Sequence, residues 1–192
     1  AIGGVPQGGH SLGAAANVEV LIGQPNLFDF YDGGGLDLTC LGLAQADAKG
    51  NINVSKFNGR MVGCGGFVNI SQNTKNVIFC GTFTAGKSLI EVKDRGLQIV
   101  QDGEFTKFVD RVEQITFSGE YGVQTGQNVL YVTERAVFRL TEGGLELIET
   151  APGIDLEKHI LDKMDFKPLI SRNLKEMDAD IFDNTPLKIG GR

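Results

Sequence analysis

Residues 81–88, GTFTAGKS, have the spacing of a P-loop, in which four residues separate a glycine from Gly-Lys-Ser. Such a loop binds phosphate where a strand leads into it and a helix begins at the lysine, because backbone N–H groups then surround the phosphate. Residues 76–80, NVIFC, are apolar and suit the strand. Residues 88–100, however, alternate between apolar and polar around a turn at residues 94–96, which predicts a β-hairpin. The pattern therefore favours a hairpin, and a phosphate-binding NTPase would need a helix after Lys87.

Three glycine-rich stretches are further candidates for chemistry that uses the backbone. They are GGVPQGG at residues 3–9, DGGGLD at residues 32–37 and GCGGF at residues 63–67. Each follows or interrupts an apolar segment, and exposed N–H groups at such turns can stabilise an oxyanion without a side chain. Each could equally be a tight turn in a fold rich in small residues. The sequence thus predicts an anion-binding crevice built from backbone and leaves the alternative of simple turns open.

Few side chains in these stretches suggest a nucleophile. Asp37 could orient a substrate or cap a turn, and Cys64 lies between glycines with neither histidine near it in sequence. A small buried cysteine is the interpretation we favour for Cys64. Glu19 is expected to be a solvated charge, and His159 a surface residue at the edge of an apolar helix face.

Composition excludes several classes of protein. The 192 residues suit one domain, and the net charge of -6 with a pI near 4.9 argues against a nucleic-acid partner. No apolar run approaches the roughly 20 residues of a membrane span, and no signal-peptide pattern opens the chain. Three cysteines without a Cys-x-x-Cys pair fit reduced thiols in a cytoplasmic protein, and two histidines, His10 and His159, make a histidine-rich metal centre unexpected.

The elements that must position these residues are mostly strands. We expect a helix over residues 14–23, a strand at residues 27–31 (LFDFY), and two strands around a hairpin tip at residues 47–53. A helix is expected to start within residues 69–75.

The second half of the chain continues the alternating pattern. Strands are expected over residues 112–119 (VEQITFSG), 128–140 and 141–149, and Asp155 is expected to cap a helix that follows them. The prediction is a strand-rich α/β domain with β-hairpins.

Six motifs in this order resemble those of a known family. They are IGGVPQGG, FDFYDGGGLDLTCLGLAQADAKGNINVSKF, GCGGFVNISQN, FCGTFTAG, VEQITFSG and YVTERAVF. The chain resembles, from Ala1 to about Leu187, the C-terminal half of the family I coenzyme A transferases. Among these it is most similar to the propionate (short-chain acyl-CoA:acetate) CoA-transferases.

The resemblance implies an open α/β fold of the NagB/RpiA/CoA-transferase type with a mixed sheet. It also implies a ping-pong transfer of CoA between a short-chain acyl-CoA and a carboxylic acid, with CoA as substrate and no other cofactor. In this family a glutamate attacks the thioester and gives an acyl-glutamyl anhydride, which CoA thiolate converts to a glutamyl-CoA thioester. A cytoplasmic homo-oligomer is the implied setting.

The family's catalytic glutamate belongs to a Glu-x-Gly motif that aligns about three residues upstream of Ala1. The resemblance therefore implies that residues 1–192 are most of the C-terminal domain without its N-terminal portion, inactive by themselves. The N-terminal half of the enzyme, or a separate chain carrying it, would be the partner. A non-catalytic partner subunit of the same fold is the alternative.

The resemblance also assigns roles to residues within the chain. Gly63, Gly65 and Gly66 match the family's GxGG motif, whose backbone N–H groups, at Gly65 and Gly66 here, serve the oxyanion hole around the glutamyl carbonyl; Gly63 would border the CoA. Asp37 stands where relatives have an asparagine whose amide joins that hole, and an ionised aspartate would repel the oxyanion. The loop that carries Gly86 and Lys87 corresponds to one that borders bound CoA, so both are candidate CoA contacts, and no metal is implied.

Overall fold

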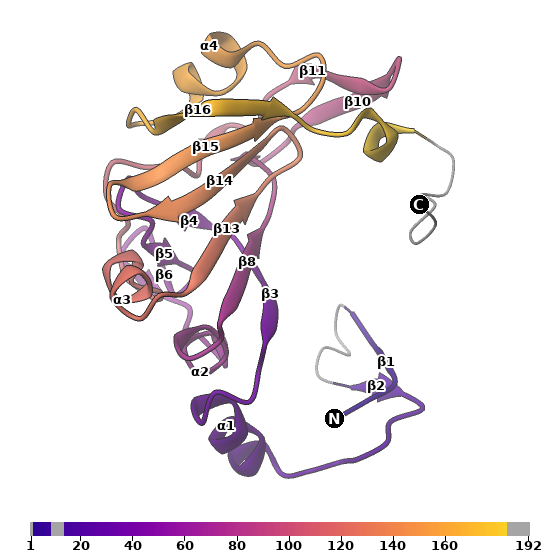
Figure 1. The fold of residues 1–192 in the computed structure, drawn as a ribbon, viewed down its shortest axis with the longest axis vertical. Coiled ribbons are helices and arrows are strands. Elements are labelled where there is room, and N and C mark those ends of the chain that lie inside the picture. Colours follow the sequence, from indigo (N-terminus) through magenta and orange to yellow (C-terminus); the bar gives the residue numbers. More distant parts are fainter. Residues whose placement is uncertain (1, 9–13, 184–192) are drawn as a thin grey trace.

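The computed structural model describes residues 2–8 and 14–183, and its centre is a mixed sheet (Figure 1). From one edge to the other, the strands are β16 (Leu169–Glu176), β15 (Gly144–Thr150), β14 (Ala136–Thr141), β13 (Asn128–Val132), β8 (Asn76–Cys80) and β3 (Leu38–Gly42). The strands β3, β8 and β13 run parallel, and β13, β14 and β15 form antiparallel hairpins. The domain is therefore α/β with a mixed sheet, as the sequence predicts.

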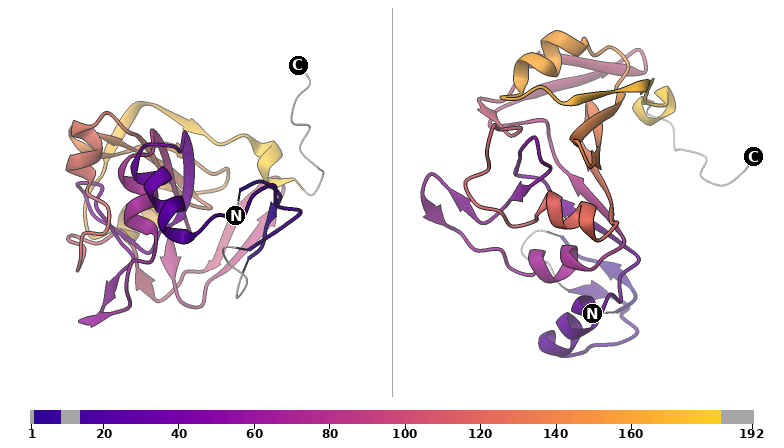
Figure 2. Two further views of the ribbon diagram at one scale, coloured as in Figure 1. Left: turned by 90° about the horizontal axis from the view of Figure 1, so that it is seen from below. Right: turned by 60° about the vertical axis from the view of Figure 1, so that its left-hand side comes forward.

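Five two-stranded ribbons surround the sheet. They are β1 (Val5–Pro6) with β2 (Ala15–Ala16), β4 (Gln45–Ala46) with β5 (Ile52–Asn53), β6 (Lys56–Phe57) with β7 (Arg60–Met61), β9 (Thr84–Ala85) with β12 (Phe105–Thr106), and β10 (Leu89–Lys93) with β11 (Gly96–Gln101). The β1–β2 ribbon lies apart from the sheet, and the β6–β7 hairpin reaches out from the body of the domain (Figures 1 and 2).

The helices are short. They are α1 (Gln24–Asp32), α2 (Phe67–Gln72), α3 (Gly119–Gln124) and α4 (Leu156–His159), with 3₁₀ turns η2 (Leu161–Lys163) and η3 (Ala179–Phe182). The helices α1 and α2 lie side by side at one end of the sheet, and α4 lies at the other end (Figure 1). The Asp155 carboxylate accepts the Lys158 N–H at 2.8 Å, which confirms the predicted cap of α4.

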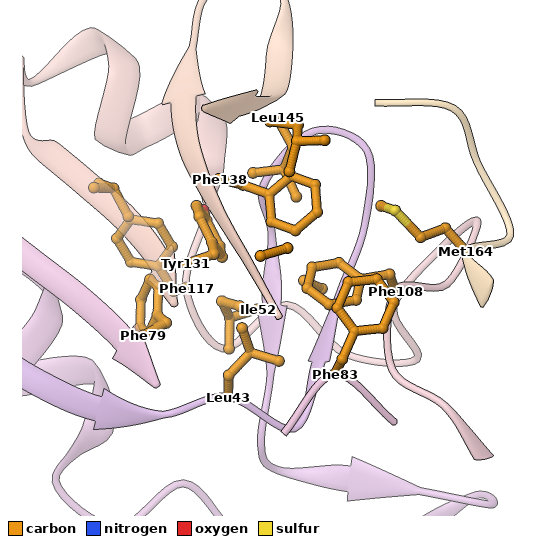
Figure 3. Close-up of a cluster of buried hydrophobic side chains, with 14 of the residues drawn as sticks. Leu43, Ile52, Phe79, Phe83, Phe108, Phe117, Tyr131, Phe138, Leu145 and Met164 are labelled. Atoms are coloured by element: carbon orange, nitrogen blue, oxygen red, sulfur yellow. The ribbon is translucent and has the colours of Figure 1, made fainter. Parts of the chain in front are cut away.

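The core is a cluster of aromatic rings between the sheet and the ribbons (Figure 3). Phe79 packs edge-on against Phe117 with ring centres 5.0 Å apart. Phe108 lies 4.7 Å from Phe83 and 5.0 Å from Phe138. Such pairs contribute about 0.5–1.5 kcal/mol each beyond the area they bury, so the cluster holds the ribbons against the sheet.

The predicted hairpin tip at residues 47–53 is confirmed as the β4–β5 ribbon and its turn. The Asp47 carboxylate accepts the N–H groups of Lys49 and Asn51. Gly50 has φ of 77°, and an added Cβ would lie 2.7 Å from the Tyr131 hydroxyl oxygen. The turn therefore needs glycine both for its conformation and because Tyr131, whose hydroxyl donates to the Gly50 carbonyl, packs directly against it.

A buried arginine fixes the turn between β13 and β14. Arg135 is fully buried, and its guanidinium donates to Glu134 and Asp102, each at 2.7 Å, and to the His159 carbonyl at 3.1 Å. The guanidinium carbon also lies 5.0 Å from the centre of the Phe83 ring. These contacts join the end of β11, the sheet and α4 into one unit.

Two predictions for residues 14–31 are wrong. Residues 27–31 lie in the helix α1, not in a strand: Pro25 occupies its first turn and Gly33 follows its end, which are the usual flanking signals of a helix. The expected helix over residues 14–23 is instead β2 followed by irregular chain, with Asn17 at φ of 56° interrupting any helix.

A third prediction, the strand at residues 112–119, is also wrong. Apart from one bridge, between Phe117 and Ile52, this segment pairs with no strand of the described residues, and α3 begins at Gly119. Its hydrogen bonds are made largely by side chains instead of a ladder. The expected helix start within residues 69–75 is realised earlier, as α2 at Phe67–Gln72.

Candidate functional site

The glycine loop, residues 63–66, connects β7 to α2. Gly63 and Gly65 have φ of 88° and 52°, the left-handed region that favours glycine, whereas Gly66 has φ of −84°. A Cβ added at Gly63 or Gly65 would meet no atom within 4 Å. The first two glycines are therefore required by the path of the backbone and not by close packing, and open space lies beside them.

Three consecutive N–H groups of the loop, those of Cys64, Gly65 and Gly66, are unpaired within the described residues. The Gly63 N–H donates to the Ser55 carbonyl at 3.2 Å, and the Phe67 N–H donates to the Cys64 carbonyl at 3.1 Å. Within residues 2–8 and 14–183, the N–H groups of Gly65 and Gly66 have no acceptor. Neighbouring backbone donors without an acceptor can bind a ligand oxygen that carries negative charge.

Of the other two glycine-rich stretches, DGGGLD does not leave its glycine donors free in this way. The N–H groups of Gly33, Gly34 and Gly35 donate to carbonyls of the last turn of α1 and so close that helix. A Cβ added at Gly4 would lie 2.2 Å from the Ala16 carbonyl oxygen, so glycine there permits β1 and β2 to pair. Gly9 and His10 lie outside the described residues.

The helix α1 packs against the glycine loop and α2. The Asp32 carboxylate accepts from the Asn69 side-chain amide at 2.9 and 3.1 Å, and its carbonyl accepts from Asn73 at 2.6 Å. The ring of Phe28 lies against Gly66, where an added Cβ would be 3.0 Å from the ring carbon Cζ. The DGGGLD stretch thus contributes to the site by holding α2, through Asp32.

Cys64 is exposed, so the expectation that it is buried is wrong. Its thiol lies 3.6 Å from the Gly65 carbonyl oxygen. His159, in contrast, lies in α4 at the opposite end of the domain, where its Nδ1 accepts the Asp155 N–H (Figure 1). The structure therefore does not bring His159 to Cys64 as an activating base.

Asp37 lies at the amino end of β3, next to the carboxyl end of α2. Its carboxylate is 3.6 Å from the Lys75 ammonium, and its carbonyl accepts from Asn76. Gly66 precedes the opposite end of α2, and the six residues of this helix span about 9 Å at 1.5 Å per residue. The structure thus places Asp37 beside a lysine and beyond the far end of α2 from the unpaired N–H groups.

Gly86 and Lys87 follow β9 and precede the β10–β11 hairpin. Gly86 has φ of 98°, and an added Cβ would lie 2.5 Å from a Glu104 carboxylate oxygen. Lys87 is exposed, and its carbonyl accepts from the Gln101 side chain at 3.1 Å. Residues 88–100 form the predicted hairpin, with Asp94 and Arg95 in left-handed conformation at its turn, so no helix follows Lys87 and the P-loop is excluded.

Three residues that sequence reasoning missed hold the glycine loop. Ser55 accepts from the loop's first glycine, and Glu113 and Thr116 make long-range hydrogen bonds to the chain that leads into it. Polar residues within the VEQITFSG motif were the available signal. Sequence distance hides the contact, since Thr116 and Ser55 are 61 positions apart.

Neither a metal-binding cluster nor a membrane-spanning helix occurs among the described residues. There, no group of three or more histidine, cysteine, aspartate or glutamate side chains is arranged to hold a metal ion. No helix in the same residues has the length and apolar character needed to cross a bilayer.

Comparison with known proteins gives close relatives, although no family model matches the chain. Acetate CoA-transferase YdiF of Escherichia coli strain K12 is 51% identical over 181 residues, which cover 94% of this chain and 34% of that protein. Caffeate CoA-transferase of Acetobacterium woodii is 51% identical over 185 residues, which cover 94% of this chain and 35% of that protein. The chain spans about a third of the length of these relatives.

A solved structure confirms the fold. The acyl-CoA transferase YdiF of Escherichia coli O157:H7, in a thioester complex with CoA, superposes with a TM-score of 0.88 at 49% identity. The match covers 95% of this chain and 34% of that one. The α/β fold expected from the sequence resemblance is therefore present.

Proposed function

We propose that this chain, which is homologous to a segment of the CoA-transferases, forms part of an enzyme that exchanges CoA between a short-chain acyl-CoA and a free carboxylic acid. The observation that carries the proposal is 51% identity over 94% of the chain to two proteins named as CoA-transferases. The CoA thioester complex of a relative with the same fold supports CoA as the substrate. Acids of the acetate and propionate type are the proposed acyl groups.

The proposed chemistry is nucleophilic catalysis by a glutamate that the family resemblance aligns about three residues upstream of Ala1. Its carboxylate attacks the thioester carbonyl, the C–S bond breaks, and CoA leaves as thiolate from an acyl-glutamyl anhydride. The thiolate then attacks the glutamyl carbonyl and releases the first acid, which leaves a glutamyl-CoA thioester. The second acid repeats these steps in reverse and departs as its CoA ester.

Gly65 and Gly66 are proposed to stabilise the oxyanions of these steps. Each attack on a carbonyl places negative charge on its oxygen, and preorganised N–H donors lower the barrier most where water is excluded. The absence of an acceptor for these two neighbouring N–H groups within the described residues supports this role. Because the Gly63 N–H is engaged by Ser55, Gly63 would contribute to the shape of the CoA-bordering loop and not as an oxyanion donor.

The remaining assignments stay proposals of the same kind. Lys87 is exposed and is proposed to contact a CoA phosphate, and Gly86 permits the left-handed turn that precedes it. Direct participation of Asp37 in the oxyanion hole stays a prediction. In such a role Asp37 would have to leave its ion pair with Lys75. The rest of the enzyme, in the same or a separate chain, is the proposed partner, within a cytoplasmic homo-oligomer.

The test uses the complete enzyme that contains this chain. With acetyl-CoA and propionate, it should form propionyl-CoA and acetate, which chromatography separates. With acetyl-CoA alone, its intact mass should increase by that of CoA less one water, and peptide mapping should place the increase on a glutamate. Failure to exchange CoA would refute the proposal, and a thioester found on a different polypeptide would favour the alternative of a non-catalytic partner subunit.

A further inference from the structure

The VEQITFSG segment, residues 112–119, lies against the β6–β7 hairpin that leads into the glycine loop. Glu113 holds the tip of this hairpin: one carboxylate oxygen accepts the Asn58 N–H at 2.7 Å and the other accepts the Gly59 N–H at 3.0 Å. Asn58 and Gly59 have φ of 51° and 74°, so the turn is one that few residues adopt. Hydrogen bonds to an ionised acceptor are about twice as strong as neutral ones, and two of them fix the turn's orientation.

Thr116, three residues further along, holds the base of the same hairpin. Its hydroxyl oxygen lies 2.8 Å from that of Ser55 and accepts the Val54 N–H at 3.2 Å. The Ser55 carbonyl in turn accepts the N–H groups of Val62 at 2.9 Å and Gly63 at 3.2 Å. One extended segment therefore holds both the tip and the base of the hairpin. At the base, Ser55 connects Thr116 to Gly63, the first glycine of the loop.

A loop with three glycines in four residues needs such anchors. Glycine loses more conformational freedom on ordering than any other residue, and Gly63 and Gly65 have no packed neighbour on their Cβ side. A displacement of about 1 Å in a catalytic group can lower a rate on the order of a hundredfold. To hold the N–H groups of Gly65 and Gly66 in place, the glycine loop must be restrained at both ends, where the chain enters it from β7 and where it leads into α2.

We infer that Glu113 and Thr116 are positioning residues for the oxyanion-stabilising N–H groups of Gly65 and Gly66. The inference rests on the proposed function. It goes beyond that function by assigning the VEQITFSG segment a task in the reaction. Each side chain acts through the β6–β7 hairpin and the chain that leads into it.

The experiment uses four variants of the complete enzyme. Glu113→Gln removes the charge and replaces one acceptor oxygen with an amide donor, and Thr116→Val removes the hydroxyl while keeping the shape of the side chain. Thr116→Ser keeps the hydroxyl and is the conservative variant that should retain activity. Glu120→Gln is the matched charge control, because the one hydrogen bond of the Glu120 side chain within the described residues comes from Gln124 of its own helix.

Two readouts are measured together. In Glu113→Gln and Thr116→Val, kcat should fall about tenfold with KM for both substrates unchanged, less than the loss expected from deleting a donor itself. Hydrogen exchange at Val62 and Gly63 should accelerate about fivefold, the effect of losing roughly one hydrogen bond. Thr116→Ser and Glu120→Gln should match the wild type in both readouts.

Three results would overturn the inference. They are wild-type kcat in both test variants, unchanged exchange at Val62 and Gly63, and a loss of kcat in Glu120→Gln equal to that in Glu113→Gln. An active wild type with any of these results removes the positioning role alone. A wild type that exchanges no CoA refutes the proposed function instead, and the inference falls with it.

Discussion

Deleting the Gly66 N–H is the sharpest test of the glycine loop, and Gly66→Pro does so with little change in backbone conformation. Gly66 has φ of −84°, within about 20° of the value that proline requires. Gly65, at φ of 52°, cannot accept proline without rebuilding the loop. The substitution at Gly66 therefore removes one donor and leaves its neighbour in place.

A matched variant isolates the donor. Gly66→Ala adds the same Cβ, 3.0 Å from the Phe28 ring, but keeps the N–H, so the ring must shift by a few tenths of an ångström in both variants. Loss of one oxyanion-hole donor lowers kcat about 10²–10³-fold, or about 2.7–4 kcal/mol of transition-state stabilisation. We expect Gly66→Pro to lose this much relative to Gly66→Ala, and Gly66→Ala to stay within about threefold of the wild type, a factor worth less than 1 kcal/mol.

The assay is the initial rate of CoA transfer from acetyl-CoA to propionate by the complete enzyme, with thermal unfolding followed by circular dichroism. Both variants must unfold cooperatively near the wild-type temperature for the comparison to count. A folded Gly66→Pro with kcat within a factor of about two of Gly66→Ala would refute the role of this N–H in the reaction. Equal large losses in both variants would assign the effect to the Phe28 contact instead.

Three further predictions concern other parts of the chain. Lys87→Ala should raise KM for acyl-CoA about fivefold, and by less at high salt, without changing KM for the carboxylic acid. Calorimetry should detect no Mg-ATP binding before or after the change. An unchanged KM for acyl-CoA would place Lys87 outside the CoA site. Tyr131→Phe leaves the buried Gly50 carbonyl without its donor and should cost about 1–3 kcal/mol in urea unfolding, whereas an unchanged midpoint would show that water replaces the hydroxyl. The pKa of Glu113 is lowered from 4.5 by the N–H groups of Gly59 and Asn58, with a smaller contribution from the charge of Lys56. Its ionised form therefore stabilises the fold fully above the ordinary pKa of 4.5. The stability difference between wild type and Glu113→Gln should shrink as pH falls from 4.5 through the lowered pKa, and a difference independent of pH would contradict the assignment.

Much of the strand structure, in the sheet and in the ribbons, can be predicted from local patterns, because strand and turn signals act over a few residues. The β10–β11 hairpin follows from alternation and from the residues at its turn, and it is what excludes a P-loop at Lys87. The failure at α1 has a physical cause as well. The LFDFY stretch has the aromatic bias of a strand, which favours the wrong assignment. Pro25 and Gly33 are the flanking signals of a helix, and none of the residues of α1 is fully buried.

The glycine loop could be predicted as a turn, but its free donors could not. Whether a backbone N–H is available depends on which carbonyl lies near it, and the Ser55 carbonyl engages Gly63 while sparing Gly65. The anchors are more distant still, since Glu113 is 55 positions from Asn58. Spacing along the chain carries no signal for such contacts, whereas the family resemblance points to the glycine loop without supplying its geometry.

The DGGGLD and GCGGF stretches show why composition alone does not make an anion site. Both are glycine-rich turns next to a helix, yet in the first the three glycine N–H groups close the last turn of α1. In the second, the N–H groups of Cys64, Gly65 and Gly66 lie before a helix begins and remain unpaired within the described residues. A backbone donor can stabilise an oxyanion when the fold both leaves it without an acceptor and restrains it. The loop itself meets the first condition, and residues far from it in the sequence, Glu113 and Thr116, are positioned to meet the second.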